Sequence, residues 1–187
     1  YVAPHDPGLL AFEYVEHLGI VLDLAGPPRT RLAVTHVGGA GLTLPRYVEH
    51  TRPGSPQIVL EPDTALTDAV RAALPLPRGH RIRVRPLDGR TGMAALADAS
   101  ADVVIVDAFE AGVVPGELTT IEFYADCLRV LRGNGLLGVN LTDAPDRRYL
   151  ARVVGALHAA GAEVVAEYGE HLGVRVELKH PKPGPTL

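Results

Sequence analysis

Four short segments carry residues whose types and spacing could bind a ligand. A glycine turn at Gly38-Gly39-Ala40-Gly41 is followed along the chain by three carboxylates, Glu61, Asp88 and Asp107. Glycines let a backbone approach a ligand closely. A carboxylate about 20 residues after such a turn can accept hydrogen bonds from both hydroxyls of a ribose. The turn and Glu61 therefore indicate a nucleoside site.

Each of these segments also has a simpler explanation. Asp88 precedes Gly89 and could belong to an ordinary turn, Asp107 could cap a helix or loop, and Glu61 could be a solvated strand end. The glycines could merely tighten a strand–turn–helix–strand unit. The joint pattern favours a site, because all four segments follow predicted parallel strands. Open parallel sheets bind ligands beyond the carboxyl ends of their strands.

Apolar runs that predict strands alternate five times with helical patterns, and a pair of strands follows. The predicted strands cover 32–37, 58–60, 82–84, 102–107, 136–141, 163–168 and 174–179. The predicted helices cover 8–24, a segment with Pro45 near its start, a segment that begins at Asp63 or Thr64, 91–97, 120–131 and 146–160. This order predicts an α/β fold, a three-layer Rossmann-like sandwich with a mostly parallel seven-stranded sheet.

The same patterns divide the chain into three parts. We expect a lead-in and helix at 1–28, a nucleoside-binding domain at 29–180 and a loose tail at 181–187. Gly133 to Gly135 is expected to end the helix at 120–131. In the helix that follows Asp63, small and apolar residues line one side: Ala65, Leu66, Ala69, Val70 and Ala73.

The composition excludes several functions. The chain has 187 residues, of which 47% are hydrophobic and 21% charged, and a net charge of -4 without a basic block. This argues against a nucleic-acid partner. No apolar run reaches the ~18 residues of a membrane helix, so we expect no membrane partner and a cytoplasmic location. The single cysteine, Cys127, is expected to be a buried structural thiol, and His36 a packed core residue.

Motifs for other chemistries are missing from the sequence. The histidines do not cluster at metal-ligand spacing, so no metal site is expected. There is no G-x-S-x-G elbow and no G-K-[ST] loop, which disfavours acyl hydrolysis and P-loop chemistry. The glycine turn lacks the full G-x-G-x-x-G pattern, which counts against a nicotinamide cofactor.

From about Asp6 to Leu141 the chain resembles the spermidine synthase (polyamine aminopropyltransferase) family, within the class I methyltransferase-like fold. The best match is 102–124, DVVIVDAFEAGVVPGELTTIEFY, which is similar to the family's apolar strand, catalytic Asp, variable loop and closing T-x-E-F-Y. The turn at Gly38 to Gly41 is similar to the family's glycine loop. Glu61-Pro62-Asp63 resembles its E-x-D motif, and Leu87-Asp88-Gly89 its G-D-[AG] motif.

The resemblance implies a role for each matched residue. Glu61 would hold the ribose hydroxyls, Asp88 and the backbone at Gly89 would bind the adenine, and the loop glycines (Gly38, Gly39 and Gly41) would lie close to the thioether end of the donor. Asp107 would orient the attacking amine and take its proton as a general base. Glu110 and Tyr124 would line the side of the amine acceptor. The donor would be decarboxylated S-adenosylmethionine or S-adenosylmethionine, and the acceptor a putrescine-like amine.

The chain also departs from the family at three points. Ala40 stands where the family's glycine loop carries an acid that reaches the donor's aminopropyl end. Glu110-Ala111 replaces the family's second Asp and the Pro after it, and the N-terminal β-rich segment lies outside these residues. A methyltransferase and a non-catalytic nucleoside-binding or scaffold protein therefore remain as alternatives. The family also implies a possible homodimer.

Overall fold

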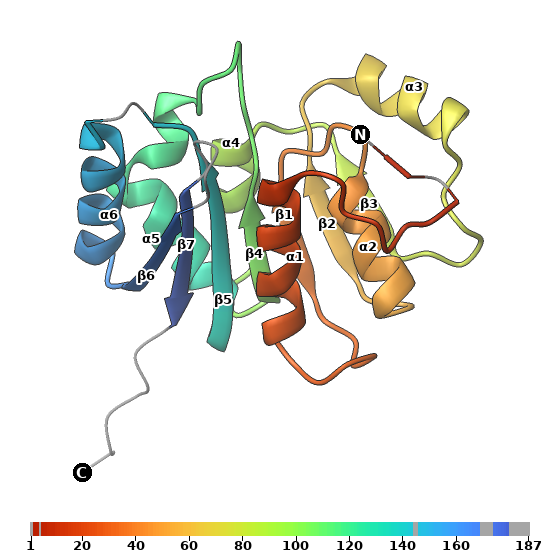
Figure 1. Ribbon diagram of the computed structural model, residues 1–187, viewed down its shortest axis with the longest axis horizontal. Helices are drawn as coiled ribbons and strands as arrows, with labels where there is room; N and C mark the ends of the chain where they lie inside the picture. The colour runs from red at the N-terminus through yellow and green to blue at the C-terminus, as the bar shows by residue number, and fades with distance from the viewer. Residues whose placement is uncertain (1, 4, 144–145, 169–173, 180–187) are drawn as a thin grey trace.

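The computed structural model describes residues 2–3, 5–143, 146–168 and 174–179, so the predicted tail at 181–187 lies outside the described residues. It contains one sheet of strand order β3-β2-β1-β4-β5-β7-β6 (Figure 1). The strands are β1 Val34–Val37, β2 Gln57–Leu60, β3 Ile82–Arg85, β4 Ala101–Val106, β5 Leu131–Leu141, β6 Glu163–Tyr168 and β7 Val174–Lys179. The predicted α/β Rossmann-like fold is confirmed.

The parallel part of the sheet comprises five strands, β1 to β5. It ends there because β7 pairs antiparallel with β5 on one side and with β6 on the other. Parallel strands need long crossover connections, whereas β6 and β7 follow each other closely and can only form an antiparallel pair.

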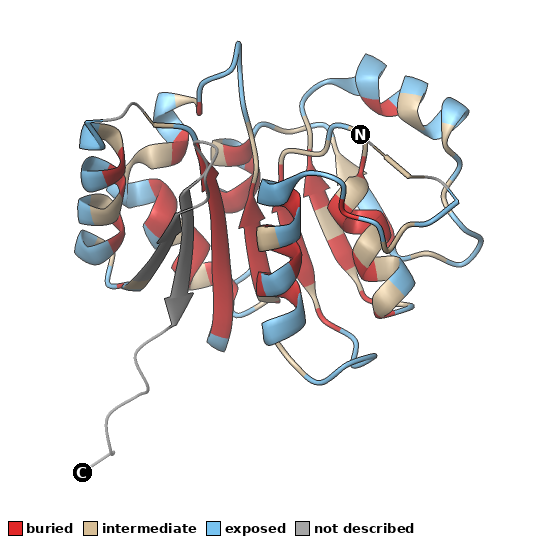
Figure 2. Cartoon of the chain, in the orientation of Figure 1, coloured by how far each residue is buried: buried red, intermediate tan, exposed pale blue. Residues whose placement is uncertain are grey.

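Helices cover both faces of the sheet (Figure 1). The helices are α1 Glu13–Leu24, α2 Thr43–Thr51, α3 Thr64–Ala73, α4 Gly89–Ala94, α5 Ile121–Val130 and α6 Arg148–Ala159, with a 3-10 turn at Gly116–Thr119. The first two lie on one face, and α4, α5 and α6 lie on the other. The central strands are buried between them (Figure 2).

Successive residues of β4 supply both cores, because side chains alternate across a strand. Val103 and Ile105 pack with α1 on one face, while Val104 and Val106 join the larger core with α5. Helix α1 thus shares a core with the sheet, and the division of the chain at residue 28 stays a prediction.

Three local predictions differ from the structure. The N-terminal helix begins at Glu13, later than expected. Helix α3 buries only Thr67 fully, and Leu66 on its predicted apolar side is 38% exposed, because the helix meets only the edge of the sheet. Gly133 and Gly135 do not cap α5. The strand β5 begins directly at Leu131, whose backbone is extended, and these glycines lie where the β4–β5 register shifts.

The chain order reverses between β1 and β4, which are neighbours at the centre of the sheet. Such a switch point opens a crevice beyond the carboxyl ends of the two strands, because their connections leave in opposite directions. The residues that follow these strands are Gly38 and Asp107. The fold therefore brings the predicted turn and the predicted base together.

Candidate functional site

The glycine turn joins β1 to α2 and touches the segment that follows β4. Gly38 has a φ of 93°, and a Cβ there would lie 2.2 Å from the carbonyl oxygen of Asp107. The Gly38 N–H donates to Leu60 O at 2.9 Å, and the Asp107 N–H donates to Val37 O at 2.9 Å. A side chain at Gly38 would push these two strand ends apart, so glycine is required here.

Glu61 follows β2 and accepts hydrogen bonds from the glycine turn. Its Oε2 accepts from the backbone N–H groups of Gly39 at 3.0 Å and Ala40 at 3.1 Å. Its Oε1 accepts from the Asp63 N–H at 3.0 Å. A carboxylate oxygen has two lone pairs, so Oε1 keeps one acceptor position while the loop is held in this way. That position can receive one ribose hydroxyl, and a second hydroxyl would have to replace a loop N–H.

Asp88 and Gly89 form the start of α4. Asp88 Oδ1 accepts from the Thr91 N–H at 2.7 Å as the helix N-cap. This bond lowers the pKa of the Asp88 carboxyl. A Cβ on Gly89 would lie 2.4 Å from Val37 and 2.9 Å from Leu118. One oxygen of Asp88 thus has the local capping role that the simpler explanation predicted. Asp88 and Gly89 also line the main cavity described below.

Asp107 lies at the end of β4 with a half-buried side chain. Asn140 Nδ2 donates to its Oδ1 at 2.9 Å. Burial raises the pKa of the Asp107 carboxyl, and the bond from Asn140 partly offsets this rise. A carboxylate with a raised pKa is a better proton acceptor near neutral pH, which suits a general base.

Two cavities meet at Asp107. The main cavity has a volume of about 640 Å³ and a small cavity has about 110 Å³. Both are lined by Tyr14, Gly38, Gly39, Ala40 and Asp107. The main cavity extends over the ends of β2 and β3, and the small cavity lies on the α1 side of the glycine turn. The structure therefore gathers Gly38, Gly39, Glu61, Asp88, Gly89, Asp107 and Glu110 around the main cavity, while Gly41 lines only the small one.

The main cavity is acidic. In the described part of the chain, no lysine, arginine or histidine is found among its lining residues. Six carboxyl-bearing residues line it: Glu61, Asp63, Asp88, Asp107, Glu110 and Glu117. A cleft lined by charges of one sign concentrates ligands of the opposite sign. The cavity therefore favours a cation.

The loop after Asp107 supplies an apolar part of the cavity wall. Phe109 is 38% exposed and lines the main cavity beside Glu110. Glu110 and Val113 exchange backbone hydrogen bonds at 2.8 and 3.1 Å. Between them Ala111 and Gly112 both have positive φ values, 49° and 82°. This tight turn fixes the backbone at Glu110, whose side chain is exposed.

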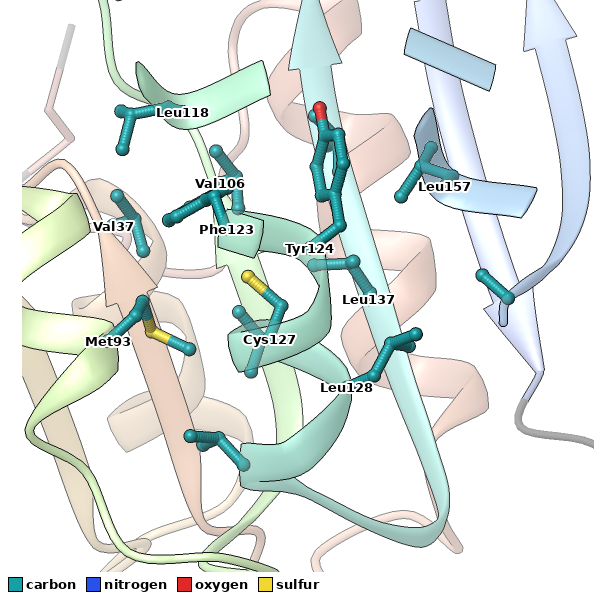
Figure 3. Packing of buried hydrophobic residues seen from close by; sticks show 14 of the residues in the cluster. Val37, Met93, Val106, Leu118, Phe123, Tyr124, Cys127, Leu128, Leu137 and Leu157 are labelled. Carbon is teal, nitrogen blue, oxygen red and sulfur yellow. The ribbon is translucent and has the colours of Figure 1, made fainter. Parts of the chain in front are cut away.

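Tyr124 is located differently from the acceptor-side position that the resemblance implied. It is fully buried in the core between α5 and the sheet, beside Phe123, Cys127 and Leu137, and lines neither cavity at Asp107 (Figure 3). The cause is helical spacing, since Tyr124 shares the inner face of α5 with Cys127 and Leu128. Burial raises the pKa of the Tyr124 hydroxyl. Cys127 is buried as predicted, and its pKa is also raised by burial.

Two residues of the site, Tyr14 and Asn140, were not predicted from the sequence. Tyr14 follows the helical spacing of the apolar residues at 8–24, which predicts a buried position, yet it lines both cavities. Burial raises the pKa of its hydroxyl, and the charge of Asp107 raises it further. Its ring stacks on Phe12 with centroids 6.0 Å apart. Asn140 had one available signal, a polar residue near the end of an apolar strand.

The sequence predicted neither a metal site nor a membrane-spanning helix. In the described residues no group of three or more His, Cys, Asp or Glu side chains is arranged to hold a metal ion. A reaction without a metal stays a prediction, since it depends on the chemistry of the donor. No helix in the described part of the chain is long and apolar enough to span a membrane.

No family model matches the chain. A polyamine aminopropyltransferase of Chromobacterium violaceum is 23% identical over 133 residues, which cover 71% of this chain and 50% of that protein. The chain thus spans half the length of the curated relative it matches.

Solved structures show the same similarity. A probable spermidine synthase from Corynebacterium glutamicum superposes with a TM-score of 0.79 at 27% identity, over 93% of this chain and 66% of that one. Human methyltransferase-like protein 13 in complex with SAH gives a TM-score of 0.73 at 19% identity, over 92% and 84% of the two chains. This second likeness shows the fold alone. The predicted resemblance to spermidine synthases and the methyltransferase-like fold are both confirmed.

Proposed function

We propose that this spermidine-synthase-like chain is a transferase that binds an S-adenosyl sulfonium donor and alkylates an amine beside Asp107. The acidic main cavity carries the proposal, because it opens at the switch point of the sheet and includes the half-buried carboxylate of Asp107. Both partners of the reaction are cations in water, the donor at its sulfonium and the acceptor at its ammonium. A ligand of net negative charge, such as a phosphate, would be repelled there.

The nucleoside would lie over the ends of β2 and β3. Glu61 has an acceptor position for a ribose hydroxyl, and Asp88 lies further along the same cavity. Asp88 has a second carboxylate oxygen that could accept from the adenine amino group. The tight packing of Gly89 on Val37 keeps the start of α4 close to the ligand. The sulfonium would then stand near Gly38, at the junction of the two cavities.

The reaction is an in-line displacement at the carbon bound to sulfur. The amine nitrogen forms a bond to that carbon while the carbon–sulfur bond breaks, and the electron pair goes to sulfur, which leaves as a neutral thioether. The sulfonium is a good leaving group, so alignment of the nucleophile supplies most of the rate gain. Asp107 would take the proton of the attacking amine, and Asn140 would hold the carboxylate in place.

The acceptor would approach along the loop after Asp107. Phe109 and Tyr14 border the cavity with half-exposed rings, and Glu110 adds a carboxylate beyond them. Aromatic faces and carboxylates together bind alkyl ammonium groups. A putrescine-like amine fits this chemistry. A homodimer, a cytoplasmic location and the lack of nucleic-acid and membrane partners also belong to this proposal.

Methyl transfer from S-adenosylmethionine is a second candidate, because Ala40 provides no counter-charge for an aminopropyl ammonium. The geometry of displacement is the same, and only the carbon attacked differs. A non-catalytic nucleoside-binding role follows if neither donor reacts.

Product analysis separates these functions. The purified protein is incubated with putrescine and either decarboxylated S-adenosylmethionine or S-adenosylmethionine, and products are identified by mass spectrometry. We expect methylthioadenosine and an aminopropylated amine from the decarboxylated donor, and no turnover with Asp107→Asn. S-adenosylhomocysteine with a methylated amine would assign a methyltransferase. Absence of every product, together with nucleoside binding, would leave the binding role.

A further inference from the structure

The small cavity has a buried histidine in its wall. It is lined by His36 and Thr43 as well as by Tyr14, Ala40 and Asp107. The cavity has a volume of about 110 Å³ and lies beside the glycine turn, near which the proposed function places the sulfonium and its tail.

The hydrogen bonds around His36 fix its tautomer. Gln57 Nε2 donates to the Pro45 carbonyl at 3.0 Å, so the other end of that amide, Oε1, faces His36. The distance from Oε1 to His36 Nε2 is 3.0 Å. Because a carbonyl oxygen only accepts, Nε2 must carry the proton. In a neutral ring the second nitrogen, Nδ1, is then an acceptor.

His36 remains neutral because it is buried. Only 2% of its surface is exposed, and burial lowers its pKa to about 4. Among the described residues, no hydrogen bond reaches Nδ1. His36 lines the small cavity, so a ligand that brings an N–H into this cavity can donate to Nδ1.

We propose that His36 is a specificity-determining residue whose Nδ1 accepts a hydrogen bond from the terminal ammonium of the donor's aminopropyl tail. The inference depends on the proposed function and extends it to the tail of the donor. His36 lies on the strand that leads into the glycine turn, and Ala40 lines the same cavity. The imidazole would thus provide an acceptor in a cavity where residue 40 has no polar side chain. Asp107, at the mouth of this cavity, contributes the negative charge.

Two ligands that share the nucleoside but differ in the aminopropyl tail and in the sulfonium charge test this role. Dissociation constants are measured by calorimetry for decarboxylated S-adenosylmethionine and for methylthioadenosine, which lacks the ammonium. We expect His36→Leu to weaken the decarboxylated donor about tenfold, and to change methylthioadenosine less than about twofold. Thr35→Val is the matched control, because Thr35 is a buried polar residue on the same strand with its side chain on the opposite face. It should not change the ratio of the two constants.

Nitrogen-15 spectra of labelled histidine provide an independent reading. The chain has 8 histidines, and the signals missing from His36→Leu identify His36. We expect Nε2 protonated and Nδ1 unprotonated in the ligand-free protein, with Nδ1 shifting when the decarboxylated donor is added but not with methylthioadenosine.

The outcomes are distinguishable. A protonated Nδ1 in the ligand-free protein, or equal weakening of both ligands by His36→Leu, would overturn the role of His36 while leaving the nucleoside site intact. Failure of the wild-type protein to bind either ligand would instead overturn the proposed function, and the assignment of the tail with it.

Discussion

Asn140 Nδ2 donates a hydrogen bond to Asp107 Oδ1 at 2.9 Å, across the ends of the neighbouring strands β5 and β4. This bond stabilises the charged form of a carboxylate whose pKa is raised by burial, and so it partly offsets that rise. A residue of β5 therefore lowers the pKa of Asp107, the group proposed as the base.

Removing this bond should move the pH profile of the reaction. Because the Asn140 amide lowers the pKa of Asp107, Asn140→Leu should raise that pKa further and shift the acid limb of kcat/KM to higher pH. Activity well above the limb should change much less. The measurement is kcat/KM from pH 5 to 9 for both proteins, and an acid limb that stays in place or moves to lower pH would contradict the assignment.

Asp107→Asn should stabilise the fold at neutral pH while it removes turnover. Burial raises the pKa of Asp107 above the ordinary value of 3.8, so the folded state binds a proton more tightly than the unfolded state. Ionising the group therefore costs folding free energy, and this cost develops as the pH rises from 3.8 through the raised pKa. An asparagine carries no such cost and can still accept the bond from Asn140.

Urea unfolding at several pH values checks this prediction. The free energy of unfolding of Asp107→Asn minus that of wild type should increase from acid to neutral pH. Turnover should fall by about 10²-fold or more, the typical contribution of a general base. A difference in stability that stays constant or shrinks with rising pH would show that the pKa of Asp107 is not raised in the folded state.

Tyr124→Phe should leave the amine site unaffected. In the described part of the chain the Tyr124 hydroxyl is buried without a hydrogen-bond partner. Its removal should therefore be neutral or slightly stabilising, because a buried unpaired polar group is a cost. We expect an unchanged or higher Tm and an unchanged KM for the amine. A raised KM with normal stability would restore Tyr124 to the acceptor side, as the resemblance implied.

Ala40→Asp should favour the decarboxylated donor. Ala40 has a φ of 37°, a conformation that aspartate adopts more readily than most residues. A carboxylate there would pair with the terminal ammonium, so we expect tighter binding of decarboxylated S-adenosylmethionine by about tenfold. S-adenosylmethionine, whose tail also carries a carboxylate, should bind no better. Equal tightening of both donors would show that the tail does not reach residue 40.

The sequence could predict the order of elements because helical and strand periods are local signals. The run from Asp102 to Asp107 is apolar between two acids and has one good interpretation, a buried strand followed by a carboxylate. The strand pairs at 163–168 and 174–179 were predicted with the observed bounds. The glycine turn, Glu61 and Asp88 were placed at one edge because parallel strands present their carboxyl ends together.

What the sequence could not provide depends on packing between distant segments. In the sequence, Tyr14 is one more apolar position of a helical pattern. It belongs to the site only because the start of α1 lies beside Asp107 in the fold. Asn140 becomes informative only once β5 is known to lie beside β4. The position of Tyr124 was within reach, because Phe123, Tyr124, Cys127 and Leu128 form a core-facing helical pattern.

The most direct test of the account is calorimetry of methylthioadenosine with wild type, Glu61→Gln and Glu117→Gln. Both acids line the main cavity, but only Glu61 accepts hydrogen bonds from the glycine turn. Glu117 is exposed in the 3-10 turn at Gly116–Thr119. We predict one site in wild type, binding weakened about tenfold or more by Glu61→Gln, and less than about threefold by Glu117→Gln. Absence of binding by wild type, or equal weakening by the two variants, would contradict a nucleoside site at the switch point.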